Sequence, residues 1–164
     1  MRQAAALAAL VITLLVSACG ESSEPPAVGA AFAARANAVC QTALESKQKW
    51  SPFPVSGFNP TNPDPKAFPK VAVWLEEQVT PTFEAWLNGL TALGPPPTDG
   101  KDWSDVLAEV ARIVQGNADE ITAAKAGDTR AFVAARDRGF NTQPELVQST
   151  TAAGVPKCAD VHKA

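Results

Sequence analysis

The chain has 164 residues, of which 46% are hydrophobic and 19% charged, and its formal net charge is −3 at neutral pH. This length suits one folded domain with its own hydrophobic core. The acidic balance argues against nucleic-acid binding, because proteins that bind DNA or RNA carry basic patches.

The first eighteen residues have the pattern of a secretory signal. Arg2 supplies a positive charge, and residues 4–16 follow as an uncharged run rich in Ala, Leu, Val and Ile. This run is shorter than the roughly 20 apolar residues that a transmembrane helix needs. Ser17 and Ala18 are small and precede Cys19. We therefore expect residues 1–18 to be a signal peptide that takes no part in the fold.

The segment Val16-Ser17-Ala18-Cys19 resembles the lipobox of bacterial lipoproteins. The resemblance implies that the Cys19 sulfur receives a diacylglycerol and that the signal is cleaved before it. Several acyl chains, palmitate among them, then give a stable anchor in the cell membrane. The alternative is an ordinary secreted protein with an incidental cysteine near the cleavage site. Residues 19–26 are polar and contain Pro, so we expect a flexible tether before a single domain at 27–164.

Two cysteines remain after the anchor, Cys40 and Cys158. Removing residues 1–18 leaves 146 of the 164 residues, and the loss of Arg2 takes the net charge from −3 to −4. Thiols outside the cytoplasm tend to be oxidised, and two cysteines permit one intramolecular pairing, so we expect a Cys40–Cys158 disulfide. The alternative is a metal or redox pair. No CxxC is present and His162 is the only histidine, so we expect no metal and no cofactor.

Hydrophobic residues recur with a helical period in four segments and with a strand period in none, which predicts an all-α fold. The first helix is expected at 27–50. The segment 51–64 contains four prolines and predicts a long irregular loop. The apolar stripe of the first helix consists of Phe32, Ala36, Val39, Cys40, Ala43 and Leu44.

The second helix is expected to begin with Asp64 as its cap and Pro65 in its first turn. Pro81 predicts a kink, because proline lacks an N–H and crowds the preceding turn. Gly94 and the three prolines after it predict the end of this helix.

The third helix is expected at 101–126 and ends at Gly127, after which Asp128 can cap the fourth. Gly139 and Pro144 predict a bend or break in the fourth helix, and the residues from 161 onward predict a short tail. The sum is a four-helix up-and-down bundle with a long Pro-rich loop between helices one and two. Helices one and four would lie side by side, with the C-terminal segment folded back along helix one.

Catalytic motifs are not apparent. Nucleophile–histidine hydrolysis needs a base, and His162 lies near the chain end, where chains usually fray. We therefore expect no enzyme. Arg35 and Arg136 predict either buried stems with solvated heads or recognition of an acidic ligand group. Neighbouring acidic residues could serve in acid–base catalysis, but solvated helix faces are the favoured interpretation. These residues are Glu76, Glu77, Glu84, Asp102, Asp105, Glu109, Asp119 and Glu120.

Aromatic residues gather around the Pro-rich loop. Trp50, Phe53 and Phe58 lie in or beside it, and Trp74 lies one step off the stripe of the second helix. One interpretation is that the loop closes the open end of the bundle with its aromatics turned inward. The other is a small apolar pocket or a docking surface under the loop.

The ending Gly154-Val155-Pro156-Lys157-Cys158 and the turn Ala126-Gly127-Asp128 are similar to those of small, Ala-rich actinobacterial lipoproteins and secreted proteins. The resemblance implies a helical extracytoplasmic domain and carries no activity. We expect a non-catalytic envelope accessory protein that binds a protein partner. The alternative is a lipoprotein that binds a small molecule or lipid in an apolar pocket near the loop. A surface patch would favour the first expectation, and an enclosed cavity the second.

Overall fold

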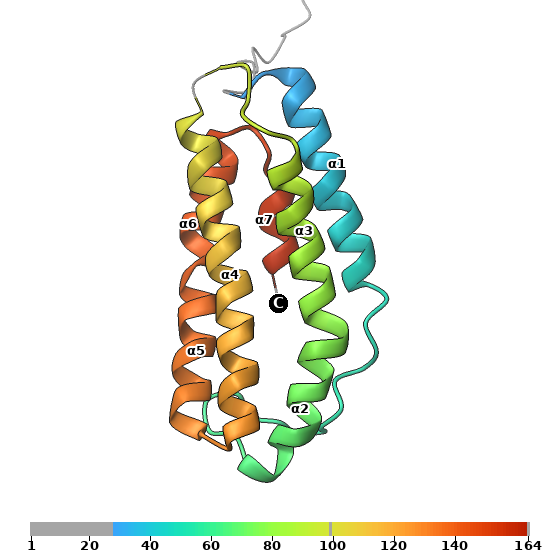
Figure 1. Cartoon of the computed structure of the whole chain (residues 1–164), viewed down its shortest axis with the longest axis vertical. Helices are drawn as coiled ribbons and strands as arrows, with labels where there is room; N and C mark the ends of the chain where they lie inside the picture. Colours follow the sequence, from blue (N-terminus) through green and yellow to red (C-terminus); the bar gives the residue numbers. More distant parts are fainter. Residues whose placement is uncertain (1–27, 99, 164) are drawn as a thin grey trace, which may run out of the picture.

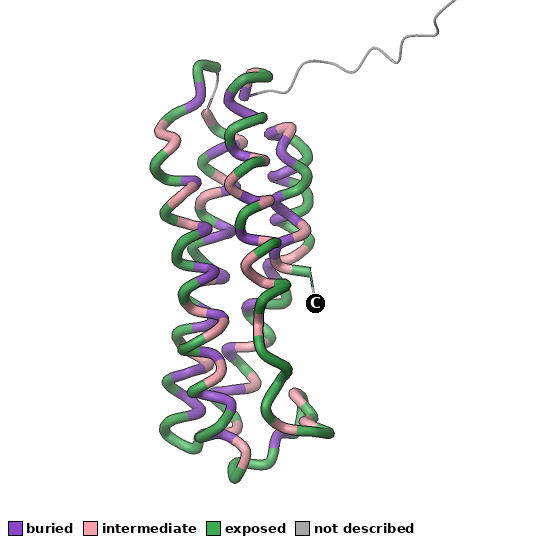
Figure 2. Tube along the Cα trace, turned by 90° about the vertical axis from the view of Figure 1, so that its right-hand side faces the viewer, coloured by how far each residue is buried: buried purple, intermediate pink, exposed green. Residues whose placement is uncertain are grey.

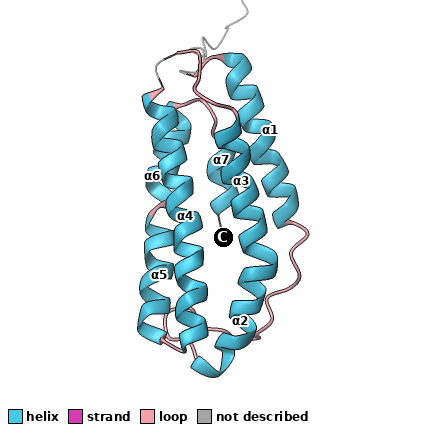
Figure 3. Ribbon diagram, viewed as in Figure 1, coloured by secondary structure: helices cyan, strands magenta, loops and turns pink. Residues whose placement is uncertain are grey.

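The computed structural model describes residues 28–98 and 100–163, and all regular elements within this part are helices (Figure 3). The all-α prediction is confirmed. The signal peptide, Cys19 and the tether lie outside the described residues. The elements are α1 (Ala30–Lys47), the 3-10 turn η1 (Pro65–Ala67), α2 (Phe68–Trp74), the π-helical turn η2 (Leu75–Val79), α3 (Thr80–Ala92), α4 (Lys101–Ala126), α5 (Thr129–Asn141), α6 (Gln143–Ala152) and α7 (Lys157–His162).

These elements form columns that run along the long axis of the molecule (Figure 1). One column consists of α2, η2 and α3 in succession, and α5 and α6 form a second, broken column. The helix α4 packs against both columns, while α1 packs against α3 and α7. The helical elements therefore outnumber the four that the sequence predicted.

Three predicted helix boundaries rest on local capping and are confirmed. The Asp64 carboxylate accepts a hydrogen bond from the Lys66 N–H at 3.0 Å, directly before Pro65. The third helix ends at Gly127, whose φ of 68° lies in the left-handed region that favours glycine. Asp128 then accepts from the Ala131 N–H at 2.9 Å and starts α5.

The interruption predicted at Pro81 takes the form of a π-helical turn. Pro81 has no N–H to donate to the preceding turn, and its ring would crowd a carbonyl there. The backbone responds by widening over Leu75–Val79. The Leu75 carbonyl accepts the backbone N–H of Thr80 and, at 3.1 Å, also the Thr80 hydroxyl, so a side chain adds to the backbone bond that closes the widened turn.

The C-terminal segment corrects one prediction. Residues 161–164 were expected to be a short tail, yet α7 covers Lys157–His162, and Val155, Cys158 and Val161 are fully buried. Their spacing of three residues gives this short segment one apolar face. The helix α7 packs against α1 and also against α6, so α7, rather than the column of α5 and α6, is the main partner of α1 on that side.

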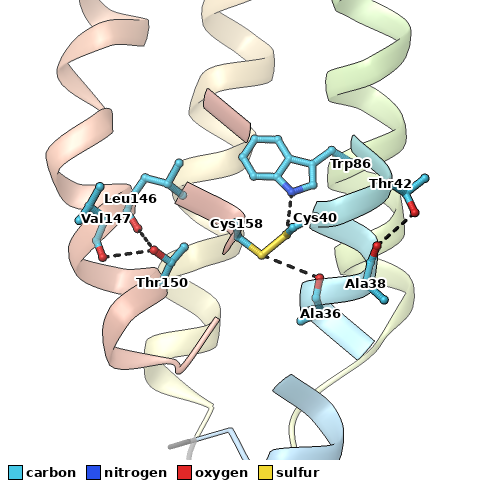
Figure 4. The surroundings of a disulfide bond; sticks show 9 residues. All are labelled: Ala36, Ala38, Cys40, Thr42, Trp86, Leu146, Val147, Thr150 and Cys158. Carbon is cyan, nitrogen blue, oxygen red and sulfur yellow. Dashed lines mark hydrogen bonds between the residues drawn. A yellow bond between two sulfur atoms is a disulfide. The ribbon is translucent and has the colours of Figure 1, made fainter. Parts of the chain in front are cut away.

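The predicted Cys40–Cys158 disulfide is present and joins α1 to α7, with its Cα atoms 4.9 Å apart (Figure 4). Both cysteines are fully buried, and the Trp86 indole N–H donates to the Cys40 sulfur at 3.2 Å. In the part of the chain that is described, no cluster of His, Cys, Asp and Glu could hold a metal ion. None of the helices described is both long and apolar enough to cross a membrane.

Buried positions follow the inward faces of the helices, whereas the segment 51–64 is mostly exposed along its outer side (Figure 2). The helix α7 packs against α1 and α6, its last residue His162 lies 6.2 Å from the Phe83 ring of α3, and it ends part-way along the bundle (Figure 1). His162 at the end of α7 and several residues of the Pro-rich loop line one cavity, which is described below.

Candidate functional site

A cavity of about 540 Å³ lies between the Pro-rich loop, the α2–α3 column, α4, α5 and the end of α7. Sites for small molecules usually measure roughly 300–1,000 Å³, so this volume suits a compact organic ligand. The lining residues are Lys47, Trp50, Phe53, Val55, Gly57, Phe58, Pro60, Trp74, Leu75, Val79, Phe83, Ile113, Asn117, Glu120, Arg136, Gly139, Phe140 and His162.

One wall of the cavity is aromatic and comes from the loop, together with Trp74 of α2. The rings of Trp50 and Trp74 meet edge to face at 5.5 Å, and Phe53 lies 5.1 Å from Trp74 and 5.2 Å from Phe58. All four candidate residues predicted from the sequence therefore line one cavity. Trp50 and Phe58 are partly buried against the core, which fits the first interpretation, whereas Phe53 is 40% exposed. A pocket also lies beneath these residues, which fits the second interpretation.

Hydrogen bonds fix both indoles in this wall. The Trp50 N–H donates to the Thr82 hydroxyl at 3.0 Å, which ties the start of the loop to α3. The Trp74 N–H donates to the Ser51 carbonyl at 3.0 Å, which ties the loop to α2. Because the polar tip of each indole is satisfied by protein, its apolar ring faces remain for contact inside the cavity.

The helices supply the rest of the apolar lining. Leu75 and Val79 come from the π-helical turn, and Phe83 follows one turn later on α3. Gly139 on α5 also lines the cavity, and a Cβ atom placed on it would meet nothing within 4 Å. The missing side chain at this glycine therefore adds open space to the cavity.

Lys47 and His162 form one polar edge of the cavity. The Lys47 ammonium donates to the carbonyls of Val161 (3.2 Å) and Lys163, where it caps the end of α7. Burial lowers the pKa of Lys47, and burial together with the nearby Lys47 charge lowers the pKa of His162 to about 4. His162 is therefore neutral at physiological pH, with Nδ1 2.9 Å from the Gln143 amide oxygen.

Glu120 and Arg136 form the second polar edge. Their closest charged atoms are 4.0 Å apart, which is an ion pair without a hydrogen bond. The Glu120 side chain is 12% exposed, and burial raises its pKa to about 7 even though Arg136 opposes this shift. Asn117 lies beside them and donates to the Thr80 hydroxyl at 2.8 Å.

The sequence analysis did not predict that two of these polar groups, His162 and Glu120, would line the cavity. His162 was expected at a frayed end, but α7 holds it against the cavity. Glu120 was expected on a solvated face, but it lies three residues after Asn117 and seven after Ile113, on the inward side of α4. This helical spacing was the available signal.

The remaining charged candidates lie elsewhere. Glu109 is also not solvated as expected, because it is buried on α4, where it pairs with Arg112 at 2.6 Å. Glu76 fits its predicted solvated face and forms an ion pair with Lys125. Arg35 is exposed over the Phe32 ring at 5.4 Å and does not line the cavity, so only Arg136 of the predicted arginine pair reaches the site.

Comparison with known proteins found no matching family model, no matching curated protein and no matching solved structure. The function is therefore argued from the geometry of the cavity and from the sequence.

Proposed function

We propose that this protein is a membrane-anchored extracytoplasmic lipoprotein that binds a small, largely apolar molecule in the cavity beneath the Pro-rich loop. The cavity is the observation that supports this proposal, since it combines a suitable volume with aromatic walls and a few polar groups. Of the two functions expected from the sequence, it favours the binding of a small molecule over the binding of a protein partner.

The proposed location rests on the lipobox-like segment Val16-Ser17-Ala18-Cys19 and on the disulfide. Structural disulfides persist outside the cytoplasm, and the anchor follows from the resemblance around Cys19. The chain carrying Cys19→Ser should lose the incorporation of labelled palmitate in its bacterial host, while a Ser22→Ala chain should keep it. Equal labelling of the two chains would refute the anchor.

We propose a binding role without catalysis. The described residues that line the cavity include no Ser, Thr or Cys that would act as a nucleophile. Among them, His162 is neutral and is held by Gln143, and Glu120 lies beside Arg136. We also propose that α1, the α2–α3 column, α4 and the α5–α6 column are an up-and-down four-helix bundle into which α7 is inserted.

The test of ligand binding uses Gly139→Leu, because this glycine lines the cavity and a Cβ atom placed on it would meet no other atom within 4 Å. The matched control is Ala134→Leu, at an exposed position on the same helix. Each full chain is exported, processed and purified gently, and its small molecules are then extracted and identified by mass spectrometry.

A molecule that co-purifies with the wild type and with Ala134→Leu, but not with Gly139→Leu, is the expected result. Circular dichroism and retention of the disulfide would show that the Gly139→Leu chain is folded. A folded Gly139→Leu chain that retains the same molecule at the same stoichiometry would refute the cavity as its site.

A second candidate function is the binding of a protein partner, as the sequence first suggested. A groove of about 420 Å³ between the start of the loop and α2 is lined by Pro52, Pro54, Pro69 and Val73, among others, and Val73 is 50% exposed. A photo-crosslinking residue at position 73 should capture one envelope protein if this function holds. An identical crosslinking pattern from the exposed position Glu84 would argue against it.

A further inference from the structure

The charged groups around the cavity are unbalanced toward positive charge. The charged residues among the described lining of the cavity are Lys47, Arg136 and Glu120, whereas His162 is neutral. The Glu120 carboxyl is only partly ionised near neutral pH because burial raises its pKa to about 7. The lining is therefore net positive in a chain whose overall charge is −3.

The guanidinium of Arg136 has hydrogen-bond donors that the described part of the chain does not use. It carries five N–H donors, yet it makes no hydrogen bond within the described part of the chain, and its one ion pair, to Glu120, spans 4.0 Å. By contrast, Arg112 and Arg138 each form a direct hydrogen bond to a carboxylate, at 2.6 Å and 2.8 Å. The Arg136 side chain is 30% exposed, so its donors are partly accessible.

The position of Arg136 is also restrained. Its guanidinium carbon lies 4.6 Å from the centre of the Phe140 ring, a cation–π contact that orients the planar group. A planar guanidinium held in this way offers a pair of parallel donors, the arrangement that matches the two oxygens of a carboxylate. Lys47, whose ammonium is held by two carbonyls, adds a second positive charge to the lining.

We propose that the cavity selects an amphipathic carboxylic acid, whose apolar body lies against the aromatic wall and whose carboxylate binds Arg136. This inference rests on the proposed function and specifies the chemical class of its ligand. A cationic ligand directed at Glu120 fits less well, because Arg136 and Lys47 would both repel it. A neutral ligand would leave the Arg136 donors unused.

The test compares three probes that share an apolar body: naphthylacetic acid, naphthylethanol and naphthylethylamine. The full, processed protein is held in lipid nanodiscs, and calorimetric titration measures binding after subtraction of empty nanodiscs. We expect the acid to bind at least about tenfold more tightly than the alcohol, and the amine to bind most weakly. An alcohol that binds as tightly as the acid, or a tighter amine, overturns the selection of a carboxylate while leaving the cavity as a binding site. If no probe binds, the proposed function itself fails and the inference fails with it.

Substitutions assign the effect to the charged edge. Arg136→Gln should weaken binding of the acid about tenfold and leave the alcohol unchanged. Arg138→Gln is the matched control, because Arg138 lies on the same helix and pairs with Asp119 at 2.8 Å outside the cavity. Glu120→Gln should strengthen binding of the acid, because it removes a competing carboxylate from Arg136. Equal loss of acid and alcohol in Arg136→Gln, or no loss of either, overturns the assignment of Arg136.

Discussion

Reducing the disulfide between Cys40 and Cys158 should lower the free energy of unfolding by about 2–5 kcal/mol. The bond spans 118 residues, and closing a loop of this length restricts the unfolded chain by about 5 kcal/mol on the loop-entropy model. Measured effects are commonly smaller, near 2–4 kcal/mol, because unfolded chains retain structure. Both cysteines are fully buried beside Trp86, and reduction removes the cross-link without removing any side chain from this region.

The assay is urea unfolding, followed by tryptophan fluorescence and circular dichroism, of the oxidised and the reduced wild-type protein. Comparing the same sequence in two redox states isolates the cross-link from any change in side-chain volume. Hydrogen exchange should show the α7 amides losing protection first, since the bond holds this short helix against α1. A loss below about 1 kcal/mol would refute the reasoning that the cross-link restricts the unfolded chain.

Gly89→Ala should destabilise the protein by about 1–2 kcal/mol in thermal unfolding. The new Cβ would lie 2.7 Å from a methyl group of Val39, and this clash outweighs the gain of about 1 kcal/mol in helix propensity. Gly116→Ala is its control and should be neutral or stabilising, because its Cβ would meet only an ordinary contact at 3.5 Å. Glu120→Gln should raise the free energy of unfolding at pH 8, by at most on the order of 3 kcal/mol, and change it little at pH 4. Burial raises the pKa of Glu120 from 4.5 to about 7, so its protonated carboxyl contributes stability fully below pH 4.5 and this contribution is lost as pH rises through 7. Denaturant unfolding across this pH range measures the change in free energy. The control is Asp119→Asn, at the neighbouring ion-paired residue, and an equal gain in stability at pH 8 in this variant would contradict the assignment of the effect to burial of Glu120.

Local chemistry in the sequence was sufficient to predict most of the helices. The third helix was predicted at 101–126 and is found at Lys101–Ala126, because Gly127 and Asp128 punctuate its end without ambiguity. The break in the fourth helix also follows from local chemistry and lies at residue 142, where α5 gives way to α6.

The π-helical turn and α7 were beyond this reasoning for two different reasons. Pro81 predicts strain in the helix, but a kink and a widened turn both relieve that strain. The choice depends on partners such as Asn117, which bonds Thr80 from a helix far along the chain. The helix α7 has only six residues, too few for hydrophobic periodicity to distinguish a helix from a turn. Its formation depends on tertiary packing and on the disulfide.

The aromatic half of the candidate site was accessible from the sequence because its residues are close together in the chain. Trp50, Phe53 and Phe58 lie within nine residues of one another, in a loop too apolar for a plain linker. The polar half comes from α1, α4, α5 and α7, and its members meet only after the helices pack. Glu120 therefore looked like any other acidic residue of an amphipathic helix, although its spacing from Asn117 matched the buried side.

The insertion of α7 divides the interior into a packed region around the disulfide and a region that contains the cavity. On one side of its end, the disulfide, Trp86 and their neighbours are fully packed, and on the other side the cavity lies open to the loop. If the cavity binds a ligand as proposed, selection can exchange a lining residue such as Phe53 or Phe58, and so change the ligand, with little penalty to the cross-linked region. Such a chain would be a scaffold on which new specificities evolve while the cysteine pair keeps the fold intact.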